Sequence, residues 1–129
     1  MRNILLIALF FTIVCCKQNE EKVIISENNF AQNEKIAREL FIHFNNHDWR
    51  KMANLYSEKA EFKEPASGMV AHQKTKEQIV KEYTELQNQF SDVQDSVVAV
   101  YPSGDKNVIV EFVSKGTLPD QSKFELPIC

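Results

Sequence analysis

The sequence predicts one α+β domain, with an antiparallel sheet and about three helices, behind a short N-terminal leader. Apolar residues recur at helical spacing through the first half of the chain. From residue 93 onward apolar and polar residues alternate between turn signals, as in strands. The 129 residues, 43% of them hydrophobic, suffice for one core. Helices followed by consecutive strands favour α+β over alternating α/β.

Residues 1–15 have the pattern of a leader. Arg2 precedes Ile4–Val14, which is apolar except for Thr12. This run is too short for a membrane span, which needs roughly 20 apolar residues, and it matches the apolar region of a secretory signal peptide. Residues 16–29, mostly polar, are expected to be a tether, and residues 30–129 the domain.

The leader ends on two cysteines and a polar stretch, 17–21. This order resembles bacterial lipoprotein signals, in which a cysteine becomes the first mature residue and carries the lipid. The resemblance implies lipidation of Cys16, which follows the small Cys15. The alternative is Cys15, which follows the bulkier Val14. The resemblance to lipoprotein signals also implies that the protein is a lipid-anchored membrane protein of the bacterial cell envelope.

Three helices are expected in the first half of the domain. The first carries an apolar stripe and ends at Asn45-Asn46-His47; the stripe is Phe30, Ile36, Ala37, Leu40, Phe41 and Phe44. Asp48 is a suitable N-cap for a second, short helix over Trp49–Tyr56. Thr75 and Gln78 have the spacing of a capping box, which predicts a third helix with its own stripe: Ile79, Val80, Tyr83, Leu86 and Phe90.

Five strands are expected around and after the third helix. Alternation predicts a strand over Lys59–Lys63, a turn over 64–68 and a short strand over Met69–His72. The chain then predicts strands over Val93–Tyr101, 108–116 and 124–128, separated by turns at 102–105 and 118–121.

This order, and the phrases at 44–48, 55–62, 65–68 and 103–105, resemble the nuclear transport factor 2-like superfamily and its SnoaL-like group. The resemblance implies a curved antiparallel sheet wrapped around the helices as a cone with an apolar pocket. It also implies a homodimer through the outer sheet face. Because the chain stops at Cys129 within an alternating run, we expect the last strand of that fold to be missing.

The aromatic residues are first of all candidates for the core. The resemblance adds that some of them line the pocket, where they would meet a small apolar ligand; these candidates are Tyr56, Phe62, Tyr83, Phe90, Phe112 and Phe124.

Glu64 is the candidate catalytic residue. It precedes Pro65, as does the general base in the ketosteroid isomerase branch that the sequence resembles. Proline holds the preceding residue extended, and alternation would place Glu64 on the face of Phe62. Of the branch's two oxyanion donors, the tyrosine is not matched, since Leu40 or Phe41 stands at its position, and the second, a late acid, would lie beyond Cys129. A surface carboxylate is the competing interpretation.

Other function classes lack support in the sequence. The net charge of -3, with 15 Lys plus Arg against 18 Asp plus Glu, does not favour a nucleic-acid partner. His43 and His47 lie four residues apart without a glutamate between them, so no metal site is expected. The sequence contains neither a glycine-rich phosphate loop nor a nucleophile elbow, so it does not predict a cofactor or covalent catalysis. A ligand-binding module, a small isomerase, cyclase or dehydratase, and a structural partner in an envelope complex remain as alternatives.

Overall fold

The computed structural model describes residues 27–129. The expected signal peptide, the lipidated cysteine and nearly all of the tether therefore lie outside the described residues. Within them, no helix is both long and apolar enough to cross a membrane.

The three expected helices are present: α1 (Glu27–Asn45), α2 (Trp49–Asn54) and α3 (Lys76–Gln89). Asp48 precedes α2, but its side chain caps no backbone N–H. Its carboxylate instead accepts a hydrogen bond from Lys51 Nζ at 2.9 Å. The prediction that α2 reaches Tyr56 was wrong by two residues, because the chain leaves the helix through a turn in which the Tyr56 N–H donates to Ala53 O.

The capping box of α3 is confirmed. The Gln78 N–H donates to Thr75 Oγ1, and the Thr75 N–H donates to Gln78 Oε1 at 2.8 Å. Each side chain thus satisfies a backbone donor that the first helical turn leaves free. This cap sets the direction in which α3 leaves the preceding strand.

Strands β1 (Lys59–Phe62) and β2 (His72–Thr75) form an antiparallel hairpin joined through a short 3-10 turn, η1 (Pro65–Ser67). The prediction of a strand from Met69 was wrong. Met69 has a left-handed φ of 63°, and its N–H donates to Glu64 O, which closes a turn. Extended backbone therefore begins only at His72.

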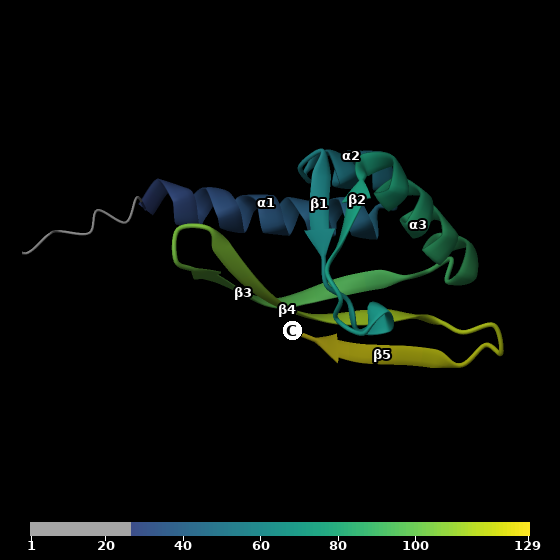
Figure 1. The fold of residues 1–129 in the computed structure, drawn as a ribbon. Coiled ribbons are helices and arrows are strands. Elements are labelled where there is room, and N and C mark those ends of the chain that lie inside the picture. Colours follow the sequence, from purple (N-terminus) through teal and green to yellow (C-terminus); the bar gives the residue numbers. More distant parts are fainter. Residues whose placement is uncertain (1–26) are drawn as a thin grey trace, which may run out of the picture.

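Strands β3 (Gln94–Ser103), β4 (Asn107–Thr117) and β5 (Lys123–Ile128) form an antiparallel meander in chain order. A bulge between Val97 and Ala99 interrupts the β3–β4 ladder. Figure 1 shows the helices over one face of this sheet, with α1 lying along it. The ring of Phe112 on β4 meets Phe41 on α1 at 4.9 Å, which identifies the inner face.

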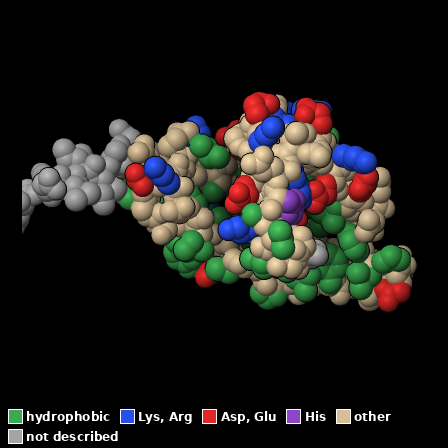
Figure 2. All heavy atoms as spheres, viewed as in Figure 1, with side chains coloured by type: hydrophobic (Ala, Val, Ile, Leu, Met, Phe, Trp, Pro, Cys, Tyr) green, Lys and Arg blue, Asp and Glu red, His purple; other side chains and the backbone are tan. Residues whose placement is uncertain are grey.

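The core lies where the end of α1, α2 and α3 meet the start of β3. Its buried residues are Phe44, Trp49, Met52, Ala53, Ile79 and Val93. Figure 2 shows charged side chains gathered over the helices and the β1–β2 hairpin, and hydrophobic ones over the lower sheet.

Candidate functional site

A cavity of about 440 Å³ lies between α3 and the inner face of the sheet. Four aromatic residues line it: Phe44, Tyr83, Phe90 and Phe124. Aliphatic side chains complete most of the wall: Leu86, Val93, Leu118 and Leu126. Leu126 on β5 is 54% exposed although it lines the cavity, so the cavity opens to solvent beside β5.

Asp95, near the start of β3, places a carboxyl group in this apolar wall. The residue is only 8% exposed, and its Oδ1 has no hydrogen-bond partner among the described residues. Burial raises the pKa of the Asp95 carboxyl, and the side chain of Ser114, its cross-strand neighbour, acts against that rise. The cavity therefore contains one acid that holds its proton more strongly than usual.

Asn45, the last residue of α1, fixes the backbone of Asp95. Its Nδ2 donates to Asp95 O at 2.9 Å, and its Oδ1 accepts from the Asp95 N–H at 2.7 Å. A side-chain amide paired with both backbone groups of one residue acts as a short extension of the sheet. This pair sets how far the Asp95 side chain reaches under α1.

A series of side-chain hydrogen bonds holds the cavity together where it meets the hydrophobic core. Trp49 Nε1 donates to Gln87 Oε1 at 2.7 Å, and Gln87 Nε2 lies 2.9 Å from His47 Nδ1. His47 Nε2 lies 3.0 Å from Val93 O. Because a carbonyl oxygen only accepts, His47 carries its proton on Nε2 and accepts at Nδ1. The turn after α1, the end of α3 and the start of β3 are thereby joined.

Gly116 shapes the cavity from β4. It pairs with Phe124 on β5, and a Cβ placed on Gly116 would lie 2.8 Å from the Phe124 ring. The missing side chain lets the ring of Phe124 lie over the strand and meet Phe90 at 5.6 Å. Glycine at this position therefore allows two rings to close the cavity from the β5 side.

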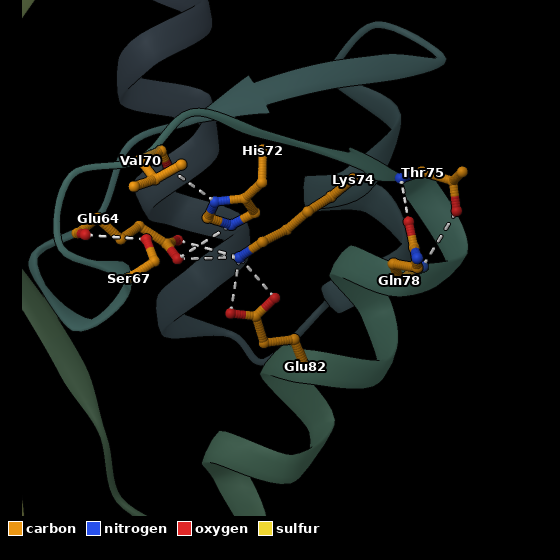
Figure 3. A network of polar contacts seen from close by, with 8 residues as sticks. All are labelled: Glu64, Ser67, Val70, His72, Lys74, Thr75, Gln78 and Glu82. Atoms are coloured by element: carbon orange, nitrogen blue, oxygen red, sulfur yellow. Dashed lines mark hydrogen bonds and ion pairs between the residues drawn. The ribbon is translucent and has the colours of Figure 1, made fainter.

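Glu64 lies in a different place, the charged network drawn in Figure 3. Both of its oxygens lie 3.1 Å from Lys74 Nζ, and Oε2 lies 3.5 Å from His72 Nε2. Lys74 also contacts Glu82 on α3 at 2.7 Å and lies 4.6 Å from the centre of the Phe62 ring. The network ties η1 to β2 and α3.

Lys74 is the centre of this network, with a side chain that is only 11% exposed. Burial acts to lower the pKa of Lys74, but hydrogen bonds to Glu82 and Glu64 outweigh it and leave the pKa raised. The ammonium group therefore stays charged and is a poor nucleophile. A fixed ion pair, rather than covalent chemistry, is what this arrangement supports.

A broader hollow of about 660 Å³ lies along α1. Among the residues that the structure describes, its wall comes from α1 alone and includes Glu34, Lys35 and Arg38. One helix face does not enclose a ligand, so we place the candidate site in the cavity that contains Asp95.

The family model of the SnoaL-like domain matches residues 37–129. The chain belongs to the SnoaL-like family. No curated protein matches it. A solved structure from Catenulispora acidiphila DSM 44928, a hypothetical protein with a ketosteroid isomerase-like fold in complex with trimethylamine, is similar. The two chains are 17% identical with a TM-score of 0.62, over 72% of this chain and 70% of the other.

These comparisons confirm the fold predicted for the SnoaL-like domain. Of the six predicted pocket residues, the structure brings Tyr83, Phe90 and Phe124 to the cavity. The other three lie elsewhere. Tyr56 and Phe62 pack against each other at the core, and Phe112 packs under α1. Burial, together with the charge of Glu64, raises the pKa of Tyr56 to about 12, so its hydroxyl stays neutral.

Glu64 does not line the cavity of the SnoaL-like domain. Strand β1 ends at Phe62, two residues before Glu64, and the Glu64 side chain turns to Lys74 and remains 36% exposed. Because the strand has ended, the alternation of strand faces that would place Glu64 on the inner side does not extend to it. Its role as a general base stays a prediction.

Asp95 is the residue that sequence reasoning missed. A signal was present, because Asp95 stands between Val93 and Val97 in a strand where alternate residues share a face. An acidic residue on the same strand face as two inward-pointing valines indicates either that the strand is interrupted there or that the carboxyl group is buried. Over residues 27–129, no group of three His, Cys, Asp or Glu residues is arranged to hold a metal ion.

Proposed function

We propose that this SnoaL-like domain binds a small, largely apolar molecule in the cavity between α3 and the sheet. The single observation that supports this most is the wall itself, four aromatic and four aliphatic residues around the Asp95 carboxyl group and the Ser114 hydroxyl. Apolar walls with few placed polar groups are typical of small-molecule sites. The similar protein from Catenulispora acidiphila, in complex with trimethylamine, shows that a protein with this fold can be found with a small ligand.

A fluorescent probe tests this proposal. The neutral apolar dye N-phenyl-1-naphthylamine should gain fluorescence on saturable binding to the wild-type chain. Leu118→Trp fills the cavity from its wall and should weaken binding about tenfold or more. Val70→Trp, at an exposed position before β2, adds the same side chain away from the cavity and should leave binding unchanged. Equal loss in both variants, or no saturable binding, would contradict the proposal.

An enzymatic role is the alternative, and it needs an acid beside the bound molecule. Asp95 meets this condition by its position and its raised pKa, whereas Glu64 is held by Lys74 outside the cavity. Exchange of the acidic protons of 2-tetralone in D2O measures proton transfer without a known substrate. An enzyme using Asp95 should accelerate exchange, and Asp95→Asn should reduce that acceleration by about a hundredfold. No acceleration by the wild type would count against this alternative.

We further propose that a lipid on Cys16 holds the domain at the membrane of a bacterial envelope. The short apolar leader that ends on cysteine supports this. In a Gram-negative host the wild type should fractionate with membranes and take up labelled palmitate. Cys16→Ser should abolish labelling, whereas Cys129→Ser should not. Labelling that persists in Cys16→Ser but disappears in Cys15→Ser would move the site by one residue.

A homodimer through the outer sheet face is also proposed. Tyr101 and Ile109 pair across β3 and β4 on that face and are about half exposed, and Val98 at the bulge is 66% exposed. Ile109→Glu should shift the oligomer toward monomer in size-exclusion chromatography with light scattering. Ile42→Glu places the same charge on the exposed side of α1 and should not.

A further inference from the structure

The unused oxygen of Asp95 is the feature of the cavity that an apolar ligand alone leaves unexplained. Asn45 occupies both backbone groups of Asp95, so the backbone is satisfied. The Ser114 side chain donates a hydrogen bond to the carboxyl group, but Oδ1 is buried and has no hydrogen-bond partner among the described residues. A buried carboxylate is costly unless a donor or a cation is near it. Asp95 lines the cavity, so a bound molecule can supply that partner once the side chain turns Oδ1 from its closed position toward the cavity.

The walls around Asp95 favour positive charge. Phe44 meets Tyr83 edge to face at 5.8 Å, and Phe90 meets Phe124 in the same way at 5.6 Å. Both pairs line the cavity. The face of an aromatic ring carries partial negative charge and attracts ammonium groups. A cation held by Asp95 would therefore lie among rings that stabilise it further.

The charged groups at the cavity favour a cationic ligand over an anionic one. None of the described residues that line it is Lys, Arg or His. Burial raises the pKa of the Tyr83 hydroxyl, and the nearby charges of Glu82, Glu64 and Asp95 act in the same direction. Tyr83 therefore stays neutral and adds no negative charge of its own. Among the described lining residues, the group that can carry charge near neutral pH is therefore the Asp95 carboxyl, which is negative when ionised.

We propose that the ligand is a small organic amine, bound as its ammonium ion. Its N–H donates to the Asp95 carboxylate, and its carbon body packs on Tyr83, Phe90 and the leucines of the wall. This inference rests on the proposed ligand-binding function and names the chemical class that the site selects. The competing arrangement is a protonated Asp95 that donates to a neutral oxygen of the ligand.

Three probes of one shape separate these arrangements: 3-phenylpropylammonium, 3-phenylpropan-1-ol and 3-phenylpropanoate. They are titrated calorimetrically into the full chain near neutral pH. The wild type should bind the ammonium about tenfold or more tightly than the alcohol, since hydrogen bonds between charged partners are the stronger ones. The carboxylate should bind weakest. Asp95→Asn should lower ammonium affinity to that of the alcohol and leave alcohol affinity nearly unchanged.

The matched control is Glu85→Gln, which removes an exposed carboxylate of α3 that does not line the cavity and should keep the preference for the ammonium. Equal affinity for ammonium and alcohol in the wild type overturns the inference and leaves the proposed function standing. A preference that persists in Asp95→Asn also overturns it, as does an alcohol whose affinity falls in that variant. Failure of all three probes to bind counts against the proposed function itself.

Discussion

The Asn45 side chain at the end of α1 pairs with both backbone groups of Asp95 at the start of β3, at 2.9 and 2.7 Å. The two residues are 50 positions apart in the chain, and their contact joins the longest helix to the sheet. It places a buried carboxyl group at the wall of the cavity. The proposed site therefore depends on an asparagine that does not itself line the cavity.

Replacing Asn45 tests this relationship. Asn45→Ala leaves the N–H and C=O of Asp95 without their partners in a partly buried place. We expect the free energy of unfolding to fall by about 1–3 kcal/mol, measured by urea denaturation. Asn46→Ala removes the exposed neighbouring amide and should change stability by less than about 0.5 kcal/mol. Equal effects would show that the two hydrogen bonds contribute little.

Asp95 should make stability depend on pH in an unusual direction. Its pKa is raised in the folded chain above the ordinary value of 3.8, so the folded state binds this proton more tightly than the unfolded state. The contribution of this proton to the free energy of unfolding is fully present below pH 3.8 and is lost as the pH rises through the raised pKa of Asp95. Asp95→Asn should therefore become more stable relative to the wild type as the pH rises.

Asp92 provides the opposite control for that measurement. Hydrogen bonds from the Thr117 side chain and N–H lower the pKa of Asp92. Its contribution is present above the ordinary pKa and is lost as the pH falls through the lowered one. Asp92→Asn should be less stable than the wild type at neutral pH and converge with it in acid. Parallel curves for Asp95→Asn and the wild type would contradict the burial of a titrating carboxyl.

Gly116 and Phe124 give a prediction about cavity shape. Gly116→Ala places a methyl group within 2.9 Å of two atoms of the Phe124 ring, which then has to move. We expect a cost of about 1–3 kcal/mol in unfolding free energy. Because Phe124 lines the cavity, binding of N-phenyl-1-naphthylamine should weaken as well. Gly104 has a left-handed φ of 62° that strains alanine, so Gly104→Ala should lower stability, and because no atom lies within 4 Å of the new Cβ it should leave binding unchanged.

Lys74 should be a stabilising residue rather than a catalytic one. Lys74→Met removes the cation between Glu64 and Glu82 and leaves two carboxylates facing each other. Because both glutamates are partly exposed, we expect a loss of only about 1–2 kcal/mol in thermal or urea unfolding. Lys81→Met removes an exposed lysine that lies 3.9 Å from Glu85 and should have almost no effect. A strong loss of dye binding in Lys74→Met would instead connect this network to the site.

Local signals predicted the elements better than they predicted the site. Thr75 and Gln78 form their capping box within one helical turn, so four residues of sequence were enough to place the start of α3. Met69 shows where such signals fail. Its left-handed φ depends on a turn that closes on Glu64 O, and an alternating pattern does not encode that turn.

The cavity depends on contacts between distant parts of the chain, and single-residue patterns predicted it only in part. Phe112 had the right type and the right sheet face, but it packs against Phe41 of α1 and is not among the residues that line the cavity. Asp95 was missed because a polar residue in a strand suggests the solvent face. Its inward position follows from Val93 and Val97 on the same side, and from an asparagine 50 residues earlier.

The central claim is that a small molecule occupies the cavity containing Asp95, and NMR contacts with selectively labelled leucine methyl groups test it most directly. With bound N-phenyl-1-naphthylamine, the dye should show intermolecular NOEs to the methyl groups of Leu86, Leu118 and Leu126, which line the cavity. It should show none to Leu55, which is not among the lining residues. NOEs absent from all three cavity leucines at saturating dye would contradict the account.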